Sequence, residues 1–253
     1  MEVPMTKQVL QITTTVEFAR EAYGHEKTTA DYEVITYCLS AARLAEQIAQ
    51  QLFKDMRSDV VPPDKHDIIE SIVHAAVLSE TVGVARRTFE HIAAITNVQI
   101  ASMVSTLTRD YRMVETKRDI EYRGRLSVSP LATQIVAVAG IICNGKSVLK
   151  FLQKNGLAAV PRSRKILAQL DGDLLAVHAV SRYYTLRLYA HAARNLIADA
   201  NQLIKKLKAD AKVARLIEKN TAGIRSRQAA KQTTTTSNEE KKSARKSASK
   251  RNS

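Results

Sequence analysis

The chain has 253 residues, of which 45% are hydrophobic, and it contains five prolines, eight glycines and a net charge of +14. Long windows without proline or glycine argue against a β-sandwich or β-barrel, whose strands need frequent turns. The charge is uneven, because residues 205–253 hold 15 Lys or Arg against 4 Asp or Glu, a net of +11, which leaves +3 for residues 1–204. The basic character therefore belongs to the C-terminal segment.

Apolar residues recur at helical spacing along most of the first 200 residues, and strand-type alternation is absent. Asp31 fits the N-cap of the second helix, and Ser129-Pro130 fits the start of a later one. The most apolar stretch, 135–143, is far shorter than the roughly 20 residues of a bilayer span, so we expect a core helix and no membrane span. The spacing predicts helices over 9–23, 31–52, 67–80, 86–95, 97–109, 129–144, 146–154, 173–197 and 199–216.

The C-terminal segment has a different composition. Beyond Gly223, Ile224 is the only large apolar residue, so this part of the chain cannot bury enough surface to offset its ordering entropy. We predict a helical domain over 1–216 and a disordered basic tail over 217–253. Clustered positive charge favours a nucleic acid or another polyanion as its partner, and a solubilising extension without a partner is the alternative. The tail residues expected to contact phosphates are Lys241, Lys242, Arg245, Lys246, Lys250 and Arg251.

Cysteine and histidine give weaker signals. Cys38 and Cys143 lie far apart and outside any CxxC, which predicts two reduced, buried thiols. No secretory leader is recognisable, so a cytoplasmic location is expected. His74 follows Glu70 by four residues and could share a metal with it. No second pair supports that site, so a hydrogen-bonded core histidine is favoured.

Several stretches, read in order over roughly residues 10–200, resemble the HD hydrolase domain of the RelA/SpoT family. Residues 16–22 (VEFAREA) and 34–43 (VITYCLSAAR) are similar to its early helix and YINHP-type segment. Residues 76–85 (AVLSETVGVA) are similar to ALLHDTVEDT, 115–118 (ETKR) to ERK, and 129–144 to the helix that contains VKLADKLYN. The resemblance implies an all-α, HD-domain-like helical bundle, with a generic bundle as the alternative.

The resemblance also implies that most metal ligands of the family are missing. HD enzymes hold a divalent cation with two His and two Asp, and the metal supplies the nucleophilic water. The four positions are held here by Tyr37, Ser79, Glu80 and Gly140. A single carboxylate does not hold a catalytic divalent ion. We therefore expect no metal, no cofactor and a catalytically inactive protein.

The nucleotide-contacting positions of the family are better preserved. The resemblance implies ligand-binding roles for Lys27, Lys117, Arg118, Asn144 and Tyr183. Lys and Arg suit phosphate oxygens, and Tyr can stack on a base. The favoured interpretation is a pseudo-hydrolase that binds a nucleotide or a partner and carries a nucleic-acid-binding tail. The alternatives are an active, divergent nucleotide phosphohydrolase and a structural protein of a virion or nucleoid.

Overall fold

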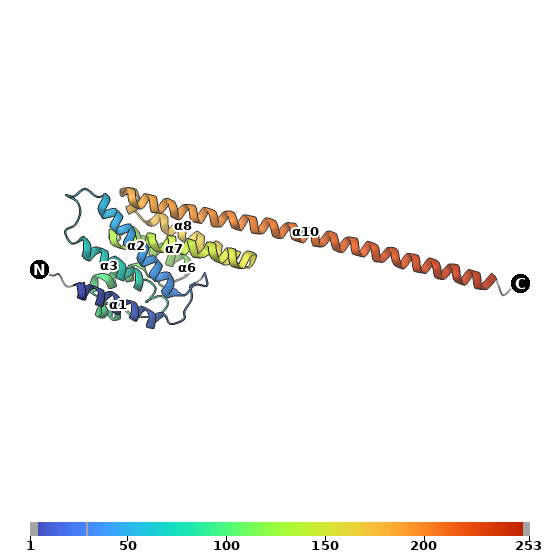
Figure 1. Ribbon diagram of the computed structural model, residues 1–253, viewed down its shortest axis with the longest axis horizontal. Helices are drawn as coiled ribbons and strands as arrows, with labels where there is room; N and C mark the ends of the chain where they lie inside the picture. The colour runs from blue at the N-terminus through green and yellow to red at the C-terminus, as the bar shows by residue number, and fades with distance from the viewer. Residues whose placement is uncertain (1–4, 29, 250–253) are drawn as a thin grey trace. The chain divides into compact units, whose positions relative to one another are not determined.

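The computed structural model describes residues 5–28 and 30–249, with side chains described from 12 to 28 and from 30 to 218. Within these residues the regular structure is helical, apart from one isolated bridge between Lys27 and Glu33. The elements, shown in Figure 1, are α1 (Met5–Tyr23), α2 (Val34–Asp55), α3 (Lys65–Leu78), α4 (Phe89–Ile95), α5 (Val98–Leu107), α6 (Glu115–Val128), α7 (Leu131–Asn155), the 3-10 turn η1 (Gly156–Ala159), α8 (Val160–Ala176), α9 (Ala179–Arg182) and α10 (Tyr184–Ser249).

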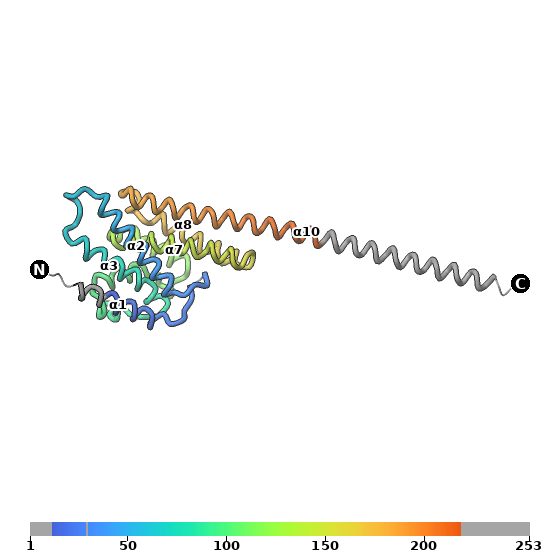
Figure 2. Tube along the Cα trace, in the orientation of Figure 1, coloured from blue at the N-terminus to red at the C-terminus, as the bar shows by residue number. Residues whose placement is uncertain are grey.

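Helix α7 is the centre of the hydrophobic core. It packs against α2, α3 and α8, and α2 also packs against α3 (Figure 2). Because helices cover α7 on several sides, the consecutive residues Ile135 to Ala139 are all buried, which explains the apolar run without strand-like alternation. Helix α2 shows the amphipathic pattern instead, with its buried stripe at Cys38, Ala41, Ala45, Ile48 and Leu52.

One stretch, Leu131–Ala176, is long and apolar enough to cross a membrane when only length and composition are considered. The core helix of a folded domain passes the same test, and 56% of the apolar window is buried in the structure. Ile135, Val138 and Ile142 are among the α7 side chains in that core.

Several local boundaries differ from those that the sequence predicts. Asp31 does not cap α2, because its φ of 64° places it in a turn, and Glu33 is the N-cap. Helix α6 occupies a stretch with no predicted helix. Only Tyr122 and Leu126 are buried on it, so its apolar stripe is too short to be recognised. The predicted helices at 129–144 and 146–154 form one continuous helix, α7, which ends at Gly156 with a φ of 56°.

Helix α10 crosses the boundary between two compact units, residues 1–204 and Lys205–Ser253. The sequence predicts a boundary at 216, the end of the helix predicted over 199–216, and the side chains of Val213, Leu216 and Ile217 around it are more than half exposed. The last buried residue described in α10 is Ile204.

Disorder is predicted from 217 onward and stays a prediction. Helix α10 extends to Ser249, and its side chains are described only to Glu218. Among the predicted tail residues, Lys241, Lys242, Arg245 and Lys246 lie on this helix without described side chains, and Lys250 and Arg251 lie outside the described residues.

Arg125 of α6 holds the end of α5. Its Nη1 donates to the backbone carbonyls of Ser105 (2.7 Å) and Thr106 (3.2 Å), and its Nη2 donates to that of Thr108 (2.7 Å). The last carbonyls of a helix have no partner within the helix. Arg125 therefore satisfies these groups and fixes where the chain leaves α5.

We predict that Arg125→Ala lowers the free energy of unfolding by about 1–2 kcal/mol, since hydrogen bonds from charged donors are worth about 1.5–3 kcal/mol and this side chain is partly exposed. Urea unfolding measures the change. Arg112→Ala is the matched control, because Arg112 is 91% exposed and pairs only with its neighbour Asp110, so its effect should stay within about 0.5 kcal/mol. Equal losses of stability in the two variants would contradict the capping role.

Candidate functional site

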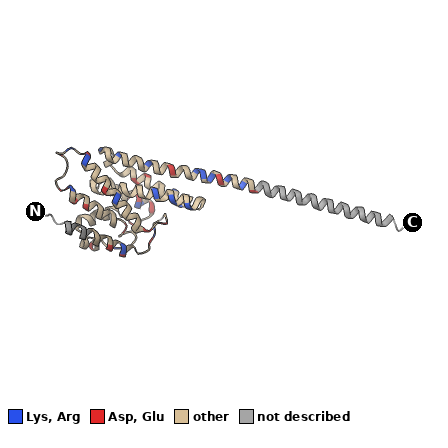
Figure 3. Cartoon of the chain, viewed as in Figure 1, with Lys and Arg blue, Asp and Glu red and all other residues tan. Residues whose placement is uncertain are grey.

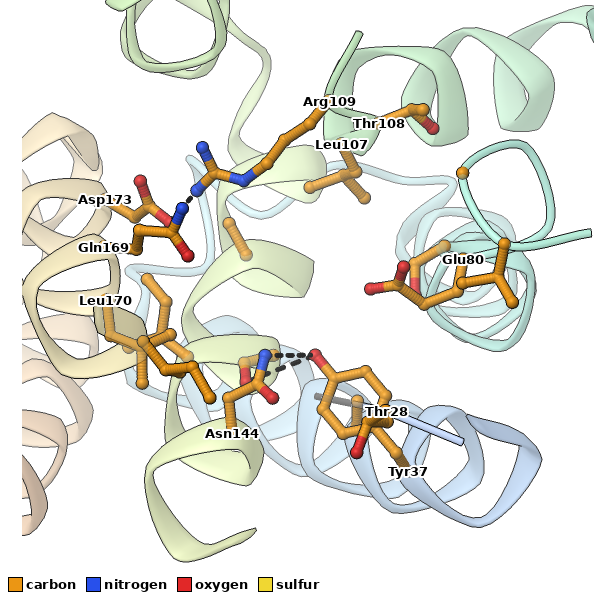
Figure 4. A pocket seen from close by; sticks show the side chains of 18 of the residues that line it. Thr28, Tyr37, Glu80, Leu107, Thr108, Arg109, Asn144, Gln169, Leu170 and Asp173 are labelled. Atoms are coloured by element: carbon orange, nitrogen blue, oxygen red, sulfur yellow. Dashed lines mark hydrogen bonds and ion pairs between the residues drawn. The ribbon is translucent and has the colours of Figure 1, made fainter. Parts of the chain in front are cut away.

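A cavity of about 390 Å³ lies among α2, α6, α7 and α8 and the segments that follow α3 and α5. Its size is typical of small-molecule sites, and Figure 4 shows ten of its residues by name. Its lining consists of Lys27, Thr28, Val34, Tyr37, Ala41, Ser79, Glu80, Gly83, Val84, Leu107, Thr108, Arg109, Tyr111, Arg118, Tyr122, Val136, Ala137, Gly140, Ile141, Asn144, Arg162, Lys165, Ile166, Gln169, Leu170 and Asp173.

The four positions that the family resemblance assigns to metal ligands all line this cavity. Tyr37 comes from α2, Ser79 and Glu80 come directly after α3, and Gly140 comes from α7. Residues up to 103 positions apart in the sequence thus meet at one site. The juxtaposition is what the resemblance implies.

Tyr37 and Gly140 fit each other closely. The Tyr37 hydroxyl donates to the Gly140 carbonyl (3.4 Å) and accepts from Asn144 Nδ2 (3.2 Å), as the dashed lines in Figure 4 show. A Cβ atom at position 140 would lie only 3.1 Å from this hydroxyl oxygen. Burial, and then the neighbouring Glu80, raise the pKa of Tyr37 well above its usual value, so the hydroxyl stays protonated.

Glu80 is the one acidic residue at these four positions. Its backbone N–H donates to the Tyr23 hydroxyl (3.3 Å), which itself donates to the Val77 carbonyl (2.9 Å) and so fixes the chain at the end of α3. The carboxylate points into the cavity (Figure 4) and has no hydrogen-bond or ion-pair partner among the described residues. Desolvation raises the pKa of Glu80, and the charge of Arg109 opposes this rise.

The site residues do not fit a divalent metal. Tyr37 is a neutral hydroxyl committed to Gly140 and Asn144. Ser79 donates to the Ala76 carbonyl (2.9 Å). Within the described part of the chain, no three His, Cys, Asp or Glu side chains come together as a ligand set. Glu80 alone supplies too little charge to draw such an ion out of water.

The cationic residues of the lining differ in whether they have partners. Arg109 pairs with Asp119 (2.6 Å) and with Asp173, and its guanidinium lies 4.1 Å from the ring centroid of Tyr122. Arg118 stacks over Tyr111 at 4.8 Å, and its buried Nε has no hydrogen-bond partner.

Three cations closer to the solvent complete this set. Lys27 pairs with Asp31 (3.2 Å), Lys165 pairs with Glu115 (2.8 Å), and Arg162 lies over the ring of Phe151. Arg118 is therefore the lining cation with an unsatisfied buried donor.

Three of the five predicted ligand-binding residues, Lys27, Arg118 and Asn144, line the cavity. Lys117 and Tyr183 do not. Successive residues of a helix point about 100° apart, so Lys117 is exposed when Arg118 faces the cavity. Tyr183 is half-buried at the end of α9, outside the lining.

Sequence reasoning misses Arg109, Lys165 and Asp173 as lining residues. Asp173 offers one usable signal, because it stands on α8 between the buried residues Leu170 and Leu174. A carboxylate on an apolar helix face needs a charged partner. Its partner Arg109 lies 64 residues away, and only the fold identifies it.

His74 lies outside this cavity. Its Nδ1 is 2.8 Å from Thr15 Oγ1, and its Nε2 is 3.5 Å from Glu70 Oε1. Burial lowers the pKa of His74, although Glu70 opposes this. The expectation of a hydrogen-bonded core histidine is confirmed. Cys38 and Cys143 are both buried and unpaired, as predicted, and burial raises the pKa of Cys38 to about 12.

Comparisons with known proteins bear on the fold. No family model matches the chain, and no curated protein matches its sequence. Among solved structures, the chain is similar to a metazoan ortholog of SpoT that hydrolyses ppGpp, with a TM-score of 0.55 and 11% sequence identity over 76% of this chain and 96% of that one. The chain has an HD-domain-like fold. Sequence identity this low shows the fold alone.

We predict that Gly140→Ala and Tyr37→Phe are energetically coupled. Alanine is worth about 1 kcal/mol more than glycine inside a helix, but with Tyr37 present the new Cβ crowds the hydroxyl oxygen. Gly140→Ala should therefore be more favourable in the Tyr37→Phe background, by a coupling energy of about 0.5–2 kcal/mol, measured by urea unfolding of the four proteins. A cycle with Gly124→Ala should be additive, because a Cβ at 124 meets nothing within 4 Å. Additivity at 140 as well would contradict the contact.

Proposed function

We propose that this protein is a non-hydrolytic HD-like module that binds a nucleotide in the cavity. The observation that carries the proposal is Arg118, whose buried Nε–H has no acceptor within a cavity of ligand size. Guanidinium groups bind phosphate oxygens with short, charge-assisted hydrogen bonds. Stacking on Tyr111 holds the guanidinium plane in place before any ligand arrives.

Other lining residues suit the remainder of a nucleotide. Lys27 and Lys165 are more than half exposed and pair with carboxylates that are themselves partly exposed. Such pairs are weak and exchange readily for a phosphate. The apolar residues Val34, Ile141 and Leu170 line the same cavity and provide surface for a base or sugar.

The lack of hydrolysis follows from the same side chains. The metal-dependent reaction needs a bound ion that lowers the pKa of water, and the donor set at Tyr37, Ser79, Glu80 and Gly140 does not hold one. Of the two carboxylates in the lining, Asp173 is committed to Arg109 and Arg123, and Glu80 has no second uncommitted carboxylate beside it. We propose that guanosine or adenosine polyphosphates bind without being consumed.

The test is a thermal-shift panel of nucleotides on three proteins. A ligand at about 100 times its Kd adds about 2.7 kcal/mol to the stability of the native state, so binding raises Tm in the unmodified protein. Arg118→Ala should remove most of the shift. Lys117→Ala is the matched control, a neighbouring cation on α6 outside the cavity, and should keep the shift.

The same samples test turnover. Chromatography after incubation with Mn²⁺ should show every nucleotide intact. Hydrolysis that EDTA abolishes would overturn the proposal, as would a shift that Arg118→Ala leaves unchanged.

We also propose that the basic C-terminal segment anchors the protein to a polyanion such as DNA or RNA. In its described part, the basic side chains Lys205, Lys206, Lys208, Lys212 and Arg215 are mostly exposed, and Figure 3 shows basic residues recurring along this stretch of α10. The rest of the segment adds further Lys and Arg. Contacts of this kind bind phosphates without reading sequence.

Truncation after Gly223 removes nine Lys or Arg. It should leave the unfolding free energy unchanged and lower affinity for a DNA or RNA probe, as measured by fluorescence anisotropy. The dependence of log K on log salt should become shallower by roughly 0.7–0.9 for each phosphate that the shortened protein leaves unneutralised. A full-length control with these nine residues changed to Gln separates charge from length and should behave like the truncation. Equal affinity of all three proteins for the DNA or RNA probe would contradict the proposed anchoring role.

A further inference from the structure

Two polar groups of opposite kind in the cavity lining have no protein hydrogen-bond partner among the described residues. Arg118 Nε is a hydrogen-bond donor without an acceptor. The Glu80 carboxylate is an acceptor without a donor among the described residues, and it points into the same space (Figure 4). Most other charged groups of the lining have ion-pair partners: Arg109 with Asp119 and Asp173, Lys27 with Asp31, and Lys165 with Glu115.

We propose that Glu80 selects ligands that carry an exocyclic amino group, in addition to the phosphate that Arg118 binds. This inference rests on the proposed function and names the class of nucleotide: one whose base bears an amino group. Glu80 is then a specificity-determining residue, and this amino group donates to a carboxylate that no described protein donor reaches.

The surroundings of Glu80 explain why the ligand has to supply this donor. The Tyr37 hydroxyl, its neighbour across the cavity floor, already donates to Gly140. The Tyr23 hydroxyl donates to Val77. Arg109 influences Glu80 through its charge but forms its ion pairs with Asp119 and Asp173. The hydroxyls and the guanidinium around Glu80 are thus committed elsewhere, which leaves its carboxylate available to a donor on a ligand.

An organic donor fits this position better than a metal ion. An amino group needs one or two acceptor oxygens, which a single carboxylate provides. A divalent ion needs several anionic ligands, and Glu80 is the only acidic residue among the four positions at this end of the cavity. The carboxylate therefore discriminates between ligands by hydrogen bonding. Its loss should change the selectivity between bases and have less effect on the affinity that the phosphate provides.

The experiment compares nucleotides that differ in their amino groups. Isothermal titration measures the Kd of adenosine, guanosine and inosine diphosphates, since inosine lacks the exocyclic amino group of both others. In the unmodified protein at a pH of about 8, at least one amino-bearing diphosphate should bind about tenfold tighter than inosine diphosphate, as expected for a hydrogen bond to a charged group.

Two substitutions at position 80 assign that preference. Glu80→Gln, close in shape but uncharged, should reduce the preference to roughly threefold or less while inosine diphosphate keeps its affinity. Glu80→Asp retains the charge and should keep a larger part of the preference. Thermal unfolding of each variant checks that it is folded.

The outcomes separate the two proposals. Equal binding of all three diphosphates, with affinity still reduced in Arg118→Ala, would refute the role of Glu80 and leave the proposed function standing. A preference that Glu80→Gln leaves unchanged would refute that role too. Absence of binding by every diphosphate would overturn the proposed function and this inference with it.

Discussion

The contact between Tyr37 of α2 and Gly140 of α7 fixes the floor of the cavity. The Tyr37 hydroxyl is held from two sides, by the Gly140 carbonyl and by Asn144, and the approach is close enough that a Cβ atom at position 140 would crowd the hydroxyl oxygen. Because α2 and α7 also form the centre of the hydrophobic core, this polar contact is set by the packing of the whole helical unit. Glu80, directly after α3, and Arg118, on α6, line the same cavity.

The sequence predicts those parts of the fold that depend on local pattern. Buried stripes at helical spacing identify α2 and the core helix α7, and the order of short motifs brings Tyr37, Ser79, Glu80 and Gly140 together. The pattern fails at α6, where two buried residues leave almost no periodic signal. The ion pair between Arg109 and Asp173 also escapes prediction, because 64 residues separate its partners. The residues predicted to bind a ligand line the cavity where helix geometry directs them toward it, as at Arg118, and lie outside it where it does not, as at Lys117.

The composition of the C-terminal segment predicts how little of it is buried. Few apolar residues mean little surface to bury, which agrees with the largely exposed side chains from Lys205 to Glu218. Several of these residues, such as Lys205 and Lys206, are good helix formers, which agrees with their place on α10. The shortage of apolar residues therefore accounts for the lack of burial in this part of the chain.

The fit between positions 37 and 140 also couples any evolutionary change at one of them to a change at the other. An aspartate at 140 alone would press its Cβ against the tyrosine hydroxyl and place a charge beside a neutral, buried phenol. A histidine at 37 alone would strip Asn144 of its acceptor and open space above the glycine. Each single substitution is unfavourable until the other is present. Substitutions accepted one residue at a time therefore tend to preserve this pair, and a change at both positions requires two substitutions together.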